Sequence, residues 1–266
     1  MQRLRSDDAE IAYEIRGNGP PVVLLHPFPT NHEFWNPAAN AFEARYRLIL
    51  PDLRGHGDSE IGDGPAFMQK HATDIARVLD AAGIGKAIFI GCSVGGYILF
   101  EFWRRFRERV TALAICDSRP QPDTAEQRSN RLKAAASVLE QGTQQFLDEM
   151  VPKLMGRTTI TTRPDLVEGA RAMMRQMSAE DISQVQQGMA ARPDSVVDLK
   201  TIDVPALIVI GEEDVMSTVA DGELMRQKIA GSQLKVIPKA GHYSPWEQPE
   251  AVGGILRQFL DDVSRK

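Results

Sequence analysis

The sequence has few cysteines and no long apolar run. Only two cysteines occur in 266 residues, Cys92 and Cys116, and each ends a short apolar segment. Such a pair is more typical of reduced core residues than of a disulfide or a metal site. No apolar stretch is long enough to span a membrane, and residues 1–17 lack the apolar core of a signal peptide. We therefore expect a cytoplasmic protein that does not enter a membrane.

An excess of basic charge is also absent. The chain has 31 Lys and Arg against 36 Asp and Glu, which gives a net charge of −5, and no long basic run. This balance excludes a surface built to bind nucleic acid. Internal repeats and low-complexity segments are missing as well. The 42% hydrophobic and 25% charged content is ordinary for a globular protein, and the length suits one domain with an insertion.

Short apolar runs that alternate with helical patterns indicate the fold. The runs, typical of parallel strands covered on both faces, lie at residues 22–25, 48–50, 87–90, 113–116, 206–210 and 234–237. The clearest helical patterns lie at residues 68–82, 94–106, 221–229 and 251–263. Alternating residues at 1–5 and 11–15 predict a leading antiparallel hairpin. Together these features predict an α/β fold with a doubly wound, mostly parallel sheet.

The segment from residue 119 to residue 203 lacks any strand pattern. It contains about four short helical patterns, a single aromatic residue, Phe146, and six of the ten methionines. An all-helical segment between two strands predicts a cap, or lid, over the ends of the strands. We therefore expect a core made of residues 1–118 and 204–266 and a helical cap made of residues 119–203.

The composition of this cap is compatible with two interpretations. Its methionines are suited either to an adaptable apolar binding face or to the filling of a small helical core. Its charges are nearly balanced, with eight arginines and three lysines against twelve acidic residues. This balance predicts solvated helix faces and not a funnel for anionic substrates, although a single arginine could still bind an acid group.

A serine lies between one predicted strand and the helix that follows it. Residues 91–95 read Gly-Cys-Ser-Val-Gly and come directly after the apolar run 87–90. A strand, a Gly-x-Ser-x-Gly turn and a helix together describe a nucleophile elbow. Side chains at Gly91 and Gly95 would collide with neighbouring backbone, so both glycines are expected to be required. The alternative is a tight glycine turn in which Ser93 is incidental.

A serine hydroxyl needs a base within hydrogen-bond distance to act as a nucleophile at neutral pH. His242 follows the last apolar run, and the carboxyl ends of the strands converge on one edge of such a sheet. His26 also ends a strand, but we expect it to hold the loop that follows. His71 lies within a helical pattern. With His242 as the base, activity should rise with pH through an apparent pKa of about 6 to 7.

An imidazole base is oriented by a carboxylate, and two regions offer one. Asp214 lies four residues after the run 206–210, and the order Ser93, Asp214, His242 matches a known chain order of Ser-His-Asp triads. Asp117 is the alternative acid, because it follows the strand next after the elbow. Glu212 and Glu213 are weaker candidates.

Two backbone amides are expected to stabilise the oxyanion that forms during attack on a carbonyl group. One is the N–H of Val94, directly after the serine. The other is the N–H of Phe28, in the stiff loop Pro27-Phe28-Pro29, because Pro27 has no N–H to donate. The alternative is a rigid strand exit in which Phe28 only packs.

Five segments carry a resemblance to the α/β-hydrolase superfamily over essentially the whole chain. They lie at residues 26–29, 51–59, 91–96, 211–214 and 241–242. The resemblance implies the α/β-hydrolase fold with a helical cap, and a structural role for His56. Pro27 stands where members usually have glycine. Within the superfamily, the elbow and the short cap are most similar to those of 3-oxoadipate enol-lactonases and small carboxylesterases.

Ser93 in the elbow, where some members have aspartate, implies an acyl-enzyme on a carbonyl substrate. We therefore predict a carboxylic ester hydrolase, an esterase or lactonase, that acts on a small molecule and requires no metal or organic cofactor. Trp35 and Trp246 are the aromatic residues expected to bind the substrate. The alternatives are a carbon–carbon bond hydrolase, a cofactor-free haloperoxidase or perhydrolase, and a small-ligand receptor on the same fold. The sequence leaves the natural substrate and the oligomeric state open.

Overall fold

Eight strands form one sheet in this computed structural model, which describes residues 1–265. The strands are β1 (Gln2–Ser6), β2 (Ala9–Arg16), β3 (Pro21–Leu25), β4 (Arg47–Pro51), β5 (Ala87–Cys92), β6 (Val110–Cys116), β7 (Ala206–Gly211) and β8 (Gln233–Ile237). Their order across the sheet is β1-β2-β4-β3-β5-β6-β7-β8. The pairs β1–β2 and β2–β4 are antiparallel, and all other neighbours are parallel. The predicted mostly parallel sheet with a leading hairpin is confirmed.

The direction in which strands are added reverses between β3 and β5. From β3 the chain moves to β4 on one side and then returns to β5 on the other side. In open α/β sheets, ligands bind beyond the carboxyl ends of the strands at such a reversal. The loop with Phe28 follows β3 and Ser93 follows β5, so both lie at this point.

Helices cover the central strands. Every residue of β5 and β7 is buried, which explains why these strands are apolar at every position and do not alternate. Helix α2 packs on α3, and α1 packs on α11. The helices around the sheet are α1 (Asn36–Ala39), α2 (Met68–Ala81), α3 (Val94–Phe106), α9 (Val219–Lys228), α10 (Ser244–Glu247) and α11 (Pro249–Ser264), with 3-10 turns η1 (His32–Trp35), η2 (Arg107–Arg109) and η3 (Leu199–Thr201).

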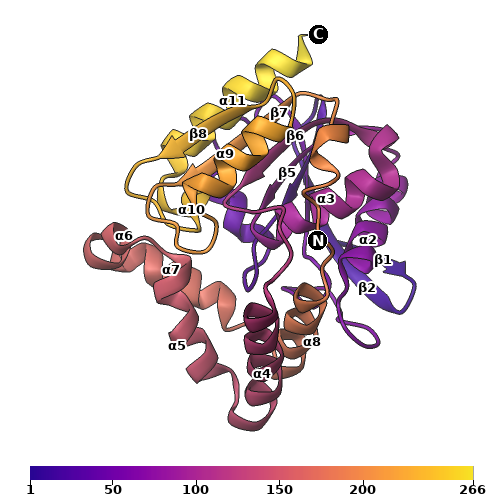
Figure 1. Cartoon of the computed structure of the whole chain (residues 1–266). Coiled ribbons are helices and arrows are strands. Elements are labelled where there is room, and N and C mark those ends of the chain that lie inside the picture. Colours follow the sequence, from indigo (N-terminus) through magenta and orange to yellow (C-terminus); the bar gives the residue numbers. More distant parts are fainter. Residues whose placement is uncertain (266) are drawn as a thin grey trace.

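Five further helices lie between β6 and β7 in the chain, where about four were expected. They are α4 (Ala125–Gln141), α5 (Thr143–Leu154), α6 (Arg157–Thr162), α7 (Pro164–Met174) and α8 (Ala179–Ala190). They lie together beyond one end of the sheet (Figure 1). Strands β6 and β7 still pair directly, with Leu113 opposite Ala206, so the inserted helices do not separate them.

Local capping determines where two of the inserted helices begin. Thr124 and Gln127 form a capping box at the start of α4, and Ser178 and Asp181 form another at the start of α8. These two helices pack against each other along their length. Among the helices of residues 1–265, none has the length and apolar character that a bilayer crossing requires.

The inserted helices are fastened to the loops beyond β7 and β8. Thr158 donates its backbone N–H to the Glu213 carboxylate at 2.8 Å. Gly156 donates its N–H to the buried Glu247 carboxylate, also at 2.8 Å. Glu213 directly precedes Asp214, and Glu247 lies five residues after His242. The position of the inserted helices is therefore coupled to the position of the residues expected to form the site.

Candidate active site

Ser93 lies in the sharp turn between β5 and α3. Its φ of 53° and ψ of −113° are outside the conformations that L-residues usually adopt. A Cβ atom at Gly91 would lie 2.6 Å from the carbonyl carbon of Gly95, and one at Gly95 would lie 2.4 Å from the Leu25 carbonyl oxygen. Only glycine fits these two positions, as the Gly-x-Ser-x-Gly motif predicts.

Hydrogen bonds to the end of β6 hold this strained turn. The Ser93 N–H donates to the Cys116 carbonyl oxygen at 3.0 Å. The Ser118 hydroxyl donates to the Ser93 carbonyl oxygen at 2.8 Å. Both the N–H and the carbonyl oxygen of Ser93 are therefore held by hydrogen bonds. Its hydroxyl group takes no part in these bonds and can contact residues beyond the edge of the sheet.

His242 lies beside this serine. Its Nε2 is 2.7 Å from Ser93 Oγ, although 149 residues separate the two in the chain. Its Nδ1 is 2.8 Å from Asp214 Oδ2. Burial alone would lower the pKa of His242, but the charge and the hydrogen bond of Asp214 outweigh burial and raise that pKa above its ordinary value. The apparent pKa of 6 to 7 expected from the sequence therefore moves upward.

The Asp214 carboxylate is held on both oxygens. Its Oδ1 accepts the N–H groups of Met216 at 2.7 Å and Ser217 at 2.9 Å, which leaves Oδ2 for His242. The turn that follows β7 supplies these donors. A carboxylate fixed in this way can keep the imidazole in one tautomer, with its proton on Nδ1 and its Nε2 facing the serine.

Asp117, the alternative acid, has different partners. Its Oδ1 accepts the Gly211 N–H at 2.8 Å, and its Oδ2 accepts the Ser244 N–H at 2.9 Å. Burial and the charge of Asp214 raise the pKa of Asp117 to about 7. Asp117 therefore ties β7 to the loop that carries His242.

The two glutamates that were weaker candidates also contact other groups. Glu213 accepts hydrogen bonds from Thr158, and Glu212 accepts the Lys239 N–H. Among these carboxylates, only Asp214 forms a hydrogen bond with the His242 ring in the described part of the chain.

The two amides expected to bind an oxyanion are unpaired. Within residues 1–265, neither the Phe28 N–H nor the Val94 N–H donates to a protein acceptor. The Phe28–Pro29 peptide bond is cis. The Tyr243 hydroxyl donates to the Phe28 carbonyl oxygen at 2.9 Å and so fixes the other side of that residue. Both amides are thus available to an acceptor that is not part of the protein.

Three other histidines have structural surroundings. Leu53 donates its N–H to His26 Nε2 at 2.9 Å, and His26 Nδ1 lies 3.0 Å from the Pro27 carbonyl oxygen, so His26 holds the loop after β3. Burial and the neighbouring His56 lower the pKa of His26 to about 3. His56 contacts the Arg54 carbonyl, and His71 is buried in α2.

Trp35 and Trp246, the two tryptophans expected to bind the substrate, have different surroundings. Trp35 is fully buried, and its ring packs edge-on against Phe34. Trp246 is partly buried, and its indole N–H donates to the Leu166 carbonyl oxygen of α7 at 3.0 Å. In the described part of the chain, neither tryptophan forms a hydrogen bond with Ser93 or His242, and substrate binding by Trp35 and Trp246 stays a prediction.

A cavity of about 470 Å³ lies between the inserted helices and the loop after β7. Met216, whose N–H binds Asp214, forms part of its wall. Phe146 of α5 forms another part and packs edge-on against Phe28, with ring centroids 6.0 Å apart. The cavity therefore adjoins both Asp214 and the loop with Phe28, and it is large enough for a small organic ligand.

Sequence reasoning missed two residues that support the site. Tyr243 fixes the Phe28 loop, and the buried carboxylate of Glu247 accepts the N–H groups of Gly241 and Tyr243 on either side of His242. Both lie within five residues of His242 in the sequence. This proximity was the one feature of the sequence that could have indicated their role. Among the described residues, no group of three or more His, Cys, Asp or Glu side chains could hold a metal ion.

Comparisons with known proteins agree with this architecture. A family model described as alpha/beta hydrolase fold matches residues 20–249. A solved structure of a thermophilic esterase from Thermogutta terrifontis, with malate bound, is 36% identical with a TM-score of 0.95, and the match covers 99% of each chain. The 3-oxoadipate enol-lactonase 2 of Acinetobacter baylyi is 28% identical over 96% of each chain. A non-heme haloperoxidase of Rhodococcus erythropolis is 27% identical over 96% of this chain and 97% of its own. The chain belongs to the α/β hydrolase fold family.

Proposed function

We propose that this protein is a serine hydrolase that cleaves small esters or lactones through an acyl-enzyme. The observation that carries the proposal is the continuous hydrogen-bond chain from Ser93 through His242 to Asp214, at 2.7 and 2.8 Å, opposite two unpaired amides. The similarity to an esterase and an enol-lactonase supports the same class of reaction.

In the proposed reaction, Ser93 Oγ attacks the carbonyl carbon of the substrate while His242 Nε2 takes the hydroxyl proton. The carbonyl oxygen becomes negatively charged and accepts hydrogen bonds from the N–H groups of Phe28 and Val94. His242 then donates its proton to the leaving alcohol, and an acyl group remains on Ser93. Water attacks this acyl group by the same route and releases the acid.

The helices from α4 to α8 are proposed to act as the cap, residues 119–203, over a core of residues 1–118 and 204–266. The cavity between these helices and the loop after β7 supports this division. In this arrangement the core supplies the chemistry, and the cap supplies most of the cavity wall that meets the rest of the substrate.

Labelling with a fluorophosphonate tests the proposal directly, because this reagent phosphonylates an activated serine hydroxyl. We expect one adduct, which peptide mass spectrometry assigns to Ser93, and turnover of 4-nitrophenyl acetate that the label abolishes. Ser93→Ala is the negative control, and Ser137→Ala, on the inserted helix α4, is the matched serine control. An unlabelled native protein, or an adduct that persists in Ser93→Ala, would contradict the proposal.

Perhydrolysis is the second candidate function, favoured by the similarity to the non-heme haloperoxidase. It would use the same acyl-enzyme, with hydrogen peroxide in place of water. Bromination of monochlorodimedone in the presence of acetate, peroxide and bromide measures it. A rate that exceeds ester hydrolysis would make perhydrolysis the principal activity.

A further inference from the structure

Three arginines of the inserted segment surround a single carboxylate. Asp123 lies 3.2 Å from Arg119, 2.6 Å from Arg131 and 2.8 Å from Arg192. We refer to these four residues as the arginine cluster. The nearly balanced charge of the whole segment conceals this cluster, because the three arginines come together only when α4 packs on α8.

The arginine cluster has more positive than negative charge. Within residues 1–265, Asp123 is the only acidic group that pairs with any of its three arginines, so two positive charges stay uncompensated. The side chains of Arg192 and Asp123 are 3% and 1% exposed. Uncompensated charge away from water is unfavourable unless an anion joins it.

Several guanidinium donors of the arginine cluster are unused. Within residues 1–265, Arg119 donates hydrogen bonds only through Nη2, and Arg131 only through Nε and Nη1. The Nε of Arg192 is buried without a partner in the described structure. A guanidinium group can donate five hydrogen bonds, and its fork suits a carboxylate. The cluster can therefore bind a further anion without breaking its contacts to Asp123.

The arginine cluster lies on the wall of the cavity beside the proposed site. Arg119, Asp123 and Arg131 line the 470 Å³ cavity together with Met216, whose N–H binds Asp214. Glu149 and Lys153 are the other charged residues of that wall, and their charges offset each other. A ligand in this cavity can thus contact the cluster.

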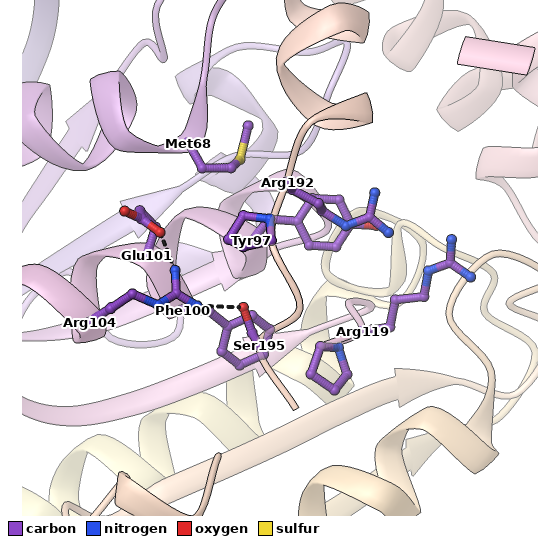
Figure 2. Close-up of a pocket in the computed structure, with 10 residues that line it drawn as sticks. Met68, Tyr97, Phe100, Glu101, Arg104, Arg119, Arg192 and Ser195 are labelled. Atoms are coloured by element: carbon purple, nitrogen blue, oxygen red, sulfur yellow. Dashed lines mark hydrogen bonds and ion pairs between the residues drawn. The ribbon is translucent and has the colours of Figure 1, made fainter. Parts of the chain in front are cut away.

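Tyr97 connects the arginine cluster to the turn with Ser93. It lies four residues after Ser93 on α3, and the Arg192 guanidinium lies over its ring at 4.2 Å from the centroid (Figure 2). In this view, the guanidinium groups of Arg119 and Arg192 lie on the same side of Tyr97. Burial alone would raise the pKa of Tyr97, but the nearby arginines outweigh burial and lower it, which is consistent with an uncompensated positive potential at this place.

We propose that the arginine cluster is an anion subsite that selects substrates with a carboxylate in addition to the ester or lactone group. This inference rests on the proposed hydrolase function for the reacting end of the substrate. The remote carboxylate would bind the free donors of Arg119 and Arg131, while the scissile carbonyl lies at Ser93.

Two matched pairs of esters test the selection. On the acyl side, 4-nitrophenyl hemiglutarate is compared with 4-nitrophenyl pentanoate, and on the alcohol side 4-acetoxybutyrate is compared with butyl acetate. We expect the charged member of at least one pair to have a kcat/KM about 10-fold higher or more, because charged hydrogen bonds are stronger than neutral ones. Charged members that are no better in either pair would overturn the proposal, while turnover of the neutral esters would leave the hydrolase function intact.

Substitutions assign the preference to particular side chains. Arg119→Gln and Arg131→Gln are each expected to lower the preference about 10-fold, mainly through a higher KM for the charged ester. Arg131→Lys keeps the charge and should retain part of the preference. Arg175→Gln, an exposed arginine of the same segment paired with Glu168, is the matched control and should change nothing. A preference that survives both cluster variants would overturn the assignment.

A binding measurement tests the subsite without any turnover. Monomethyl glutarate and dimethyl glutarate are titrated calorimetrically into Ser93→Ala, which lacks the attacking hydroxyl group. We expect saturable binding of the monoacid, about 10-fold weaker when Arg131→Gln is added and unchanged when Arg175→Gln is added. Equal binding in all three proteins would refute the subsite even if no ester were hydrolysed. Circular dichroism and thermal unfolding show whether each variant is folded.

Discussion

At the scale of single residues, the site depends on how each side chain is oriented by its neighbours. Ser93 is held in an unusual backbone conformation, and the His242 ring lies between the Asp214 carboxylate and the Ser93 hydroxyl group. Both oxygens of Asp214 are occupied, so its carboxylate cannot rotate freely. The charge of that carboxylate raises the pKa of His242 against the effect of burial, and in the proposed mechanism this pKa determines the pH at which the base becomes available.

Substitution of Asp214 by Asn tests this coupling. Removal of the charge should lower the pKa of His242 toward or below an ordinary histidine value of about 6.5. The rising limb of kcat/KM against pH should therefore move to lower pH. The rate on its plateau should fall by about 1,000- to 10,000-fold, because the tautomer is no longer enforced.

The control for this measurement is Asp63→Asn, a carboxylate with no side-chain hydrogen bond within residues 1–265 and far in the sequence from the triad. It should leave the profile unchanged. A profile of Asp214→Asn with its limb in the native position would show that Asp214 does not set the basicity of His242.

At the scale of elements, the turn between β5 and α3 depends on close backbone packing. The first turn of α3 approaches the end of β3 so closely that no side chain fits at Gly95. Because Phe28 follows the same strand, this contact sets the distance between the turn with Ser93 and the loop with Phe28. Asp117 has a comparable role between β7 and the loop with His242.

Gly95→Ala is expected to separate these elements. Its methyl group would lie 2.4 Å from the Leu25 carbonyl oxygen, so the turn must shift. We expect a loss of about 1–3 kcal/mol in the free energy of unfolding, measured in urea, and slower fluorophosphonate labelling. In Gly85→Ala the added methyl group meets no atom of residues 1–265 within 4 Å, so stability should be nearly unchanged. Equal stability of the two variants would contradict the packing argument.

Most of these elements could be predicted from the sequence. The prediction was strongest where a single pattern identifies an element. Examples are the fully apolar segments that form β5 and β7 and the Gly-x-Ser-x-Gly motif around Ser93. The short helices α1 and α10 were missed, because four residues are too few to show a helical period. The choice between Asp214 and Asp117 needed coordinates, since both acids follow neighbouring strands and only side-chain direction separates them.

At the scale of the whole molecule, buried groups from distant segments determine how stability depends on pH. Burial lowers the pKa values of three histidines, 26, 56 and 71, below the ordinary value. Neither ring nitrogen of His71 has a hydrogen-bond partner within residues 1–265. The unfolded chain binds a proton at such a site at a higher pH than the folded chain does, so acid favours unfolding there.

His71→Phe isolates one of these contributions. Below about pH 6.5 the native protein should lose about 1.4 kcal/mol of stability per pH unit at His71, until the folded-state pKa is reached. The variant lacks this loss. The difference in unfolding free energy between variant and native protein, measured in urea at pH 6.5 and 5.5, should therefore shift by about 1 kcal/mol in favour of the variant, because the full slope is reached only below this interval. An unchanged difference would show that His71 is protonated in the folded state.

The arginine cluster is the feature of the whole molecule that could not be predicted from the sequence. Counting the charges of residues 119–203 indicated a neutral cap, because a sum carries no information about position. Residue 123 lies just before α4 and residue 192 just after α8, so their contact depends on the packing of those two helices. The charge distribution is therefore a property of the tertiary structure.

The wide separation of Ser93 and His242 along the chain has a practical consequence. The hydroxyl and the imidazole are 149 positions apart, and they meet only when β5 and the segment after β8 have joined one sheet. If Ser93 reacts as proposed, a reagent that captures its hydroxyl group counts the molecules in which these two segments have come together. Pulses of such a reagent during refolding would time this tertiary contact, in parallel with optical probes that report on secondary structure alone.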